Sequence, residues 1–184
     1  NLDARMRRSM REEIRALQQR LALTVAYVTH DQSEALAVSD QIIVMNAGRI
    51  AQAGTPQQLY EHPNSEFVAG FMGEAMLFDA QAGADGSVRL GVLAVQSRRP
   101  VPAGPVKVAV RPEAWNVVAS GSGGLDGTLS KFAYLGSFQE LTVATAIGEI
   151  FVVSPDVAHA WAVGDALGLT LPGTNGVSVV EATG

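Results

Sequence analysis

The second half of the chain is a succession of short apolar runs separated by glycine and proline, and this pattern leaves few folds open. In several runs apolar residues alternate with others, which places the apolar side chains on one face of a strand. The clearest sets are Val106, Val108 and Val110; Leu167, Leu169 and Leu171; and Val177 with Val179. Glycine- or proline-containing turn signals separate the runs, at 104–105, 121–124, 164–165 and 172–176. Many short strands joined by such turns predict a small all-β barrel or sandwich over residues 78–184.

Residues 1–77 show a different pattern, in which helical and strand signals alternate. Residues 24–29 (TVAYVT) are apolar and β-branched, which predicts a strand ending at His30. Asp31 and Glu34 then supply an acidic first helical turn, which is favourable at the positive end of a helix dipole. Open α/β sheets place ligand contacts at strand ends, so His30 is the first candidate functional residue.

A predicted strand–turn–strand unit follows this helix. Residues 39–46 and 49–52 form the strands, and Ala47-Gly48 forms the turn. Thr55 then has the position of a helix N-cap, with Pro56 as the first helical residue. At the beginning of the chain, residues 3–20 predict an amphipathic helix with an arginine-rich face. That face is interpreted as a solvated surface, with an anion- or nucleic-acid-binding surface as the alternative.

In this order, the motifs THDQxEA, SDxIxVMNxGxIxQxGTPxxLYxxP and FVAxFxG resemble the C-terminal part of the ATP-binding subunit of ABC importers, over about residues 1–77. The resemblance implies an α/β remnant of a P-loop ATPase core. In that family two subunits enclose ATP, and the histidine matching His30 contacts the γ-phosphate. Asp3 matches the D-loop aspartate at the subunit interface. ATP and Mg²⁺ are the cofactors that the resemblance implies for the parent protein.

The nucleotide-holding motifs of that family are missing from this chain. A P-loop needs GxxxxGK[ST], whose amides and lysine hold phosphates, and no Gly-Lys pair occurs here. No LSGGQ-like signature and no apolar strand ending in Asp-Glu is present either. The chain, which begins at Asn1, is therefore interpreted as a C-terminal fragment of an ATPase, inactive and without cofactors by itself. The strand at 24–29 would lack the neighbours that the resemblance implies for it. We therefore expect residues 1–77 to rearrange, to pair with another copy or to use an intermolecular sheet.

The segment Val110-Arg111-Pro112-Glu113, then residues 127–137 and Gly164-Asp165, resemble the TOBE domain of importer ATPases, an OB-like β module, over residues 78–184. Arg111 and Glu113 are candidates for binding an anionic regulatory ligand, with a local ion pair or a turn-fixing role as the alternative. Trp115 and Trp161 are candidates for a ligand pocket or for the core. No oxyanion site is expected, since the SARN-type start of oxyanion-binding relatives is missing.

Composition argues against several kinds of site and partner. The 184 residues include no cysteine, which excludes disulfides and thiolate metal sites. His62 and His159 have no neighbouring ligands at metal spacing, so no metal is expected. A net charge of −5 argues against a nucleic-acid partner. No run is long enough to cross a bilayer, so any association with a membrane must come through a partner. The resemblance to importer ATP-binding subunits implies a cytoplasmic location at the inner face of the membrane, with permease subunits as that partner.

Two classes of function are compatible with the sequence. The first is an ATP-hydrolysing importer subunit that couples hydrolysis to solute uptake, of which residues 1–184 hold the histidine segment and a regulatory β domain. The second is a free-standing regulatory or ligand-binding OB-like module without ATPase activity. The expected partners are a second copy, forming a homodimer, and permease subunits. The motifs lean towards importers of ferric iron, polyamines or phosphonates.

Overall fold

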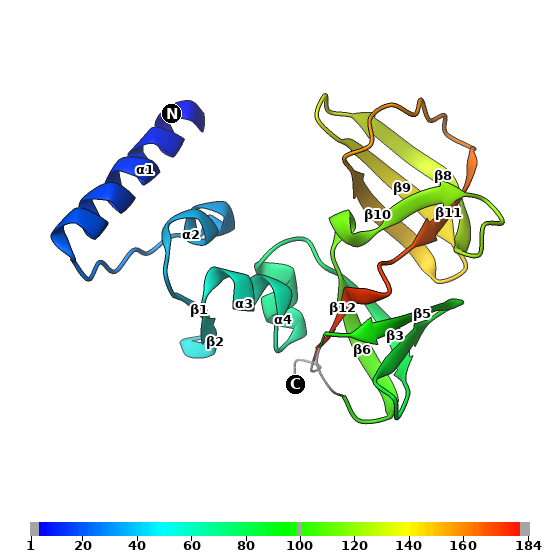
Figure 1. Cartoon of the computed structure of the whole chain (residues 1–184), viewed down its shortest axis with the longest axis horizontal. Helices are drawn as coiled ribbons and strands as arrows, with labels where there is room; N and C mark the ends of the chain where they lie inside the picture. Colours follow the sequence, from blue (N-terminus) through cyan, green and yellow to red (C-terminus); the bar gives the residue numbers. More distant parts are fainter. Residues whose placement is uncertain (1–3, 99–100, 181–184) are drawn as a thin grey trace. The chain divides into compact units, whose positions relative to one another are not determined.

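The computed structural model describes residues 4–98 and 101–180. The chain divides into two compact units, Asn1–Glu61 and His62–Gly184, shown in Figure 1. This division comes earlier than the predicted boundary after residue 77, because the short helix α4 (Glu66–Phe71) packs on the β-rich unit. Within the described residues, no helix combines the length and the apolar character needed to cross a membrane.

The described part of the first unit, from residue 4 on, contains three helices and one hairpin. The helices are α1 (Ala4–Leu21), α2 (Gln32–Val38) and α3 (Pro56–Glu61). The hairpin pairs β1 (Ile42–Asn46) with β2 (Arg49–Gly54) through Ala47 and Gly48, which both have positive φ, as tight two-residue hairpin turns require. Thr55 and Gln58 form a reciprocal cap at the start of α3, with N···O distances of 3.2 and 2.9 Å. The predicted hairpin and helix cap are therefore confirmed.

The strand predicted at residues 24–29 is wrong for this structure. Residues 23–29 have no regular secondary structure, and Val28 is 96% exposed. A strand forms only where neighbouring backbone groups complete its hydrogen bonds, and no described strand pairs with this segment. The predicted α/β sheet is thus not seen in the described part of the first unit, whose sheet is the hairpin. The apolar face of α1 is likewise about half exposed; it comprises Met6, Met10, Ile14, Leu17 and Leu21.

Outside residues 99–100 and 181–184, which are not described, the second unit has ten strands in two sheets. A closed barrel has the order β12-β5-β4-β3-β6, and an antiparallel sheet has the order β10-β9-β8-β11-β7. The barrel strands are β3 (Met76–Ala82), β4 (Ser87–Leu90), β5 (Leu93–Ser97), β6 (Gly104–Val110) and β12 (Thr174–Val180). The sheet strands are β7 (Asn116–Ala119), β8 (Leu125–Tyr134), β9 (Gln139–Thr145), β10 (Gly148–Ser154) and β11 (Ala166–Thr170). The 3-10 helix η1 (Pro112–Ala114) lies between β6 and β7. The predicted all-β OB-like barrel is confirmed.

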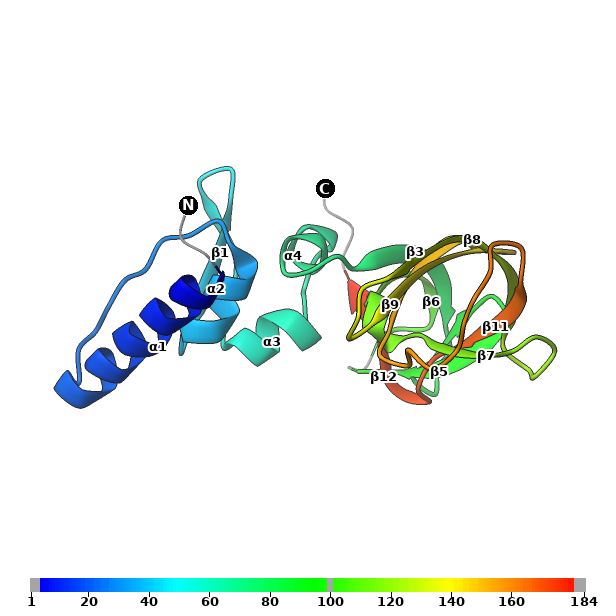
Figure 2. The same ribbon diagram turned by 90° about the horizontal axis from the view of Figure 1, so that it is seen from above.

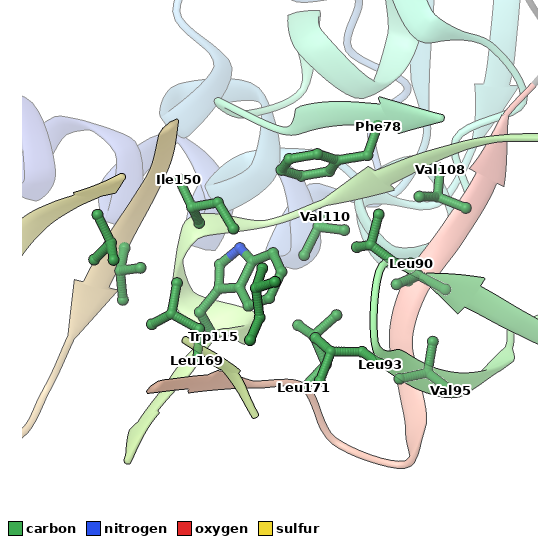
Figure 3. Close-up of a cluster of buried hydrophobic side chains, with 14 of the residues drawn as sticks. Phe78, Leu90, Leu93, Val95, Val108, Val110, Trp115, Ile150, Leu169 and Leu171 are labelled. Carbon is green, nitrogen blue, oxygen red and sulfur yellow. The ribbon is translucent and has the colours of Figure 1, made fainter. Parts of the chain in front are cut away.

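One hydrophobic core joins the barrel to the sheet. The apolar faces predicted for β6, β12 and the β11 region lie in it, all buried except Val106, which packs partly buried against it. Trp115, which follows η1, lies between the two groups of strands with Ile150 and Leu169 nearby, as Figure 3 shows. Its ring meets Phe78 of β3 edge-on, with centroids 6.1 Å apart. Trp115 is therefore a core residue, and Trp161 packs partly buried against the same cluster.

Candidate functional site

His30 occupies the turn that opens α2, and it is exposed to solvent. Hydrogen bonds hold the residues on both sides of it. Thr29 Oγ1 accepts the N–H of Asp31 at 3.0 Å. Asp31 is the N-cap of α2, and its Oδ1 accepts the N–H of Glu34 at 3.0 Å and the hydroxyl of Ser33 at 2.6 Å. These bonds lower the pKa of the Asp31 carboxyl, the Ser33 hydroxyl contributing most.

Glu34 is the centre of this turn, a role that the sequence pattern did not indicate. Its Oε2 accepts hydrogen bonds from the hydroxyls of Tyr27 and Thr29, both at 3.0 Å. Its Oε1 lies 4.0 Å from Nη1 of Arg11 on α1, and the Glu34 side chain is only 17% exposed. The hydrogen bond to Glu34 raises the pKa of Tyr27, because removing the phenolic proton would place two negative charges together.

Two arginines of the predicted solvated face of α1 have partners around α2. Arg11 approaches Glu34 in the first turn of α2. Arg15 donates to the carbonyl of Val38 at 3.2 Å and forms a 2.5 Å ion pair with Asp40, beyond the C-terminal end of α2. Figure 2 shows α1 and α2 side by side. In the sequence, the spacing of Arg11 and Arg15 by about one helical turn already places both side chains on the same face of α1.

Arg111 lies in the second unit and fastens α4 to the barrel. Its Nη1 donates to the carbonyl of Ala69 at 2.9 Å and also to the carbonyl of Gly73. Carbonyls at the C-terminal end of a helix lack intrahelical donors, and a cation is favourable there. The structure thus gives Arg111 a role in fixing local structure, and an anionic ligand for it stays a prediction. Glu113 lies in η1 and is exposed.

Two residues of β6, the strand that ends immediately before Arg111, also meet α4. Lys107 Nζ lies 3.5 Å from Oε1 of Glu66, and Ala109 packs with Ala69 and Val180. Alternate residues of a strand share a face, so positions 107, 109 and 111 all point towards the helix while the valines between them enter the core.

A buried amide organises the loop after β10. Gln139 is 1% exposed, and its Nε2 donates to the carbonyls of Asp156 at 2.8 Å and His159 at 3.1 Å. The His159 ring lies against Trp161, with centroids 3.9 Å apart. In the described parts of the chain, no three His, Asp or Glu side chains come together as a metal site would require. Asp3 lies outside the described residues, and His30 and Arg111 belong to different units.

The second unit thus consists of a closed barrel and an attached antiparallel sheet that share one core. The TOBE domain family matches residues 108–177. Similarity extends over most of the chain to "Fe(3+) ions import ATP-binding protein FbpC 1" of Rhizobium meliloti, which is 50% identical over 167 residues, or 88% of this chain and 47% of that protein. The corresponding Agrobacterium fabrum protein FbpC is 48% identical over 165 residues, or 86% of this chain and 46% of that protein.

The chain contains a TOBE domain and is related to the C-terminal region of ABC importer ATP-binding subunits, as the sequence motifs predicted. It spans about half the length of these curated relatives. A solved structure of the cytoplasmic molybdate-binding protein ModG, with molybdate bound, matches 55% of this chain and 92% of its own chain, at 21% identity and a TM-score of 0.45.

Proposed function

We propose that the chain is the C-terminal portion of the ATP-hydrolysing subunit of an ABC importer, with ferric iron as the transported solute. The observation that carries this proposal is the hydrogen-bonded His30 turn, formed by the THDQSEA sequence in a chain about half identical to Fe(3+) import ATP-binding proteins. The exposed imidazole is able to donate a hydrogen bond to a phosphate oxygen. Phosphoryl transfer depends mainly on such positioning and charge stabilisation, so one well-placed imidazole is a meaningful contribution.

The residues of this chain do not by themselves fit ATP and Mg²⁺. No Gly-Lys pair occurs in the sequence, and the described residues hold no cluster of acidic side chains for a metal ion. His30 offers a single polar contact, which is too little to hold a triphosphate. In the proposed function, the phosphate cradle and the metal ligands therefore belong to the remainder of the subunit.

The proposed partners are a second copy of the subunit and the membrane permease subunits. The proposed location is the cytoplasmic face of the membrane, where such subunits meet nucleotide. Residues 62–184 are proposed to regulate the ATPase and to contribute to dimerisation. Support comes from their separation into a compact unit with its own core.

Coding sequence upstream of Asn1 and an ATPase assay test this proposal together. We expect an in-frame P-loop, an LSGGQ-like signature and an Asp-Glu strand upstream, and hydrolysis by the longer protein that falls at least tenfold in His30→Ala. Ferric iron uptake should be lost from cells that lack the gene. A start codon at position 1, or tight Mg²⁺-dependent ATP binding by the 184-residue chain, would show the proposal to be wrong.

A further inference from the structure

The carboxylate of Glu34 joins the chain before His30 to the helix after it. Before His30, Tyr27 and Thr29 both donate to Glu34 Oε2 at 3.0 Å. After His30, the backbone N–H of Glu34 is bound by Asp31 at 3.0 Å. Glu34 is thus hydrogen-bonded to residues on both sides of the turn.

The hydrogen bonds close a ring around His30. Thr29 Oγ1 accepts from the N–H of Asp31 and donates to Glu34, while Asp31 Oδ1 accepts from the N–H of Glu34. Rotation of the backbone at His30 would displace Thr29 relative to Asp31 and break at least one of these bonds. The ring therefore fixes the direction in which His30 leaves the turn.

Side-chain hydrogen bonds are the available means of ordering this segment. Residues 23–29 belong to no helix or strand, and Tyr27 and Val28 are both largely exposed. Among the described residues, neither core packing nor a strand ladder thus holds the residues that lead to His30. In their place, Tyr27 and Thr29 are held by hydrogen bonds to the carboxylate of Glu34. That carboxylate is itself largely covered and lies 4.0 Å from Arg11 of α1.

We propose that Glu34 is the positioning residue for His30, holding the backbone of the turn so that the His30 side chain leaves it in one direction, towards a phosphate. The phosphate part of this statement rests on the proposed function, and the positioning part rests on the geometry of the turn. Helix stability alone does not account for the Glu34 side chain. Asp31 already caps α2, and it does so through the backbone N–H of Glu34, which any residue except proline would supply.

The test compares Glu34→Ala and Glu34→Gln with Glu13→Ala, which removes an exposed carboxylate from α1. In the 184-residue chain, ¹⁵N relaxation should give order parameters at Thr29, His30 and Asp31 that fall from about 0.85 to below about 0.6 in Glu34→Ala. Gln keeps an acceptor oxygen, so Glu34→Gln should restore most of the order. Glu13→Ala should resemble the wild type, and far-UV circular dichroism should be unchanged in all three.

The pKa of Tyr27 is a second measure of the same contact. Glu34 makes the largest contribution to its elevation, Asp31 adds to it and Arg11 opposes it. An NMR titration of the Tyr27 ring should therefore show a lower pKa in both Glu34 variants. Tyr27→Phe, which removes one donor and leaves the carboxylate, should loosen the turn less than Glu34→Ala.

Unchanged order at His30 in Glu34→Ala, with an unchanged Tyr27 pKa, would overturn the proposal. In the longer ATPase, kcat should fall about 10- to 100-fold in Glu34→Ala with KM nearly constant, since displacement by about 1 Å costs that much. If His30→Ala abolishes hydrolysis while Glu34→Ala does not reduce it, the positioning role is wrong. If His30→Ala retains full activity, the proposed function of His30 fails, and the relaxation data still decide whether Glu34 orders the turn.

Discussion

At the scale of single residues, Gln139 shows how a polar group stabilises an irregular loop from inside the core. Its Nε2 donates hydrogen bonds to the carbonyls of Asp156 and His159. Its Oε1 is buried and accepts no hydrogen bond from the described residues. Because Gln139 is 1% exposed, water does not readily replace a lost donor at this position.

Gln139→Leu should lower the free energy of unfolding by about 1–3 kcal/mol, because it leaves two loop carbonyls without their donor. Gln81→Leu, at an exposed position of β3, is the matched control and should change stability by less than about 0.5 kcal/mol. Urea denaturation followed by tryptophan fluorescence measures both. Equal stabilities of the two variants would contradict this role for Gln139.

The ion pair between Arg15 and Asp40 gives a pH-dependent prediction. The hydrogen bond from Arg15 lowers the pKa of Asp40 below its ordinary value of 3.8. A lowered folded-state pKa means that the contact stabilises the fold above the unfolded-state pKa and is lost as pH falls through the lower folded-state value. The attachment of α1 to Asp40 should therefore weaken only in strong acid.

In a ¹³C-carboxyl NMR titration, Arg15→Met should return the pKa of Asp40 to about its ordinary value, 3.8. Arg20→Met, at an exposed position of the same helix, should leave the pKa of Asp40 unchanged. If the pKa of Asp40 is the same in the wild type and in both variants, this ion pair does not form in solution.

At the scale of elements, α4 is a short helix whose place depends on contacts from β6. Six residues cannot sustain a helix in isolation, since nucleation is costly. Ser65 caps its beginning through a 3.4 Å contact to the N–H of Val68, and Arg111 binds carbonyls at its end. Loss of the guanidinium should release the C-terminal turn first.

Arg111→Met should speed amide hydrogen exchange at Ala69 and Met72 of the α4 region by about tenfold or more, while exchange in β8 and β9 stays as in the wild type. Arg111→Lys should restore part of the protection, because an ammonium also donates to a carbonyl but without the planar fork. Arg89→Met, at an exposed position of β4, is the control. Unaltered exchange in α4 would contradict the fastening role of Arg111.

Elements stabilised locally were predictable, and elements that depend on distant partners were not. The hairpin follows from the positive-φ turn at Ala47 and Gly48, and α3 begins where the Thr55 cap requires. The strand predicted at residues 24–29 has the right side chains, yet no described strand supplies its hydrogen bonds. For the same reason the ring at Glu34 was missed, since it links residues across a turn whose conformation no periodic pattern reveals.

At the scale of the whole molecule, the two units have different sources of stability. The large core lies wholly within residues 62–184 and combines side chains from both sheets. The first unit leaves an apolar helix face and residues 23–28 largely exposed. A unit with a small core is expected to unfold at lower denaturant concentration than one with a large core.

We expect residues 62–184 produced alone to give a dispersed ¹H–¹⁵N spectrum that overlays the corresponding signals of the whole chain. Residues 1–61 alone should be poorly ordered. Collapse of the barrel signals after removal of residues 1–61 would show that the units are not independent in stability.

The predicted homodimer is also a property of the whole chain. Exposed apolar surface of this extent favours association, so size-exclusion chromatography with light scattering should give a mass that rises with concentration. Leu17→Lys, at a half-exposed position on α1, should reduce association that uses this face, whereas Arg20→Lys should not. A monomer at all concentrations would contradict the dimer prediction.

The sequence by itself determined the all-β nature of residues 78–184, the hairpin, the cap of α3 and the relationship to importer ATP-binding subunits. These depend on alternation, turn chemistry and motif order, all of which are local. Only the tertiary structure decided that α4 belongs with the barrel, that Arg111 binds carbonyls at and just beyond the end of α4, and that Glu34 is hydrogen-bonded to residues on both sides of His30. Those outcomes depend on groups that become neighbours only after the chain has folded. The spacing of residues along the sequence does not predict such contacts.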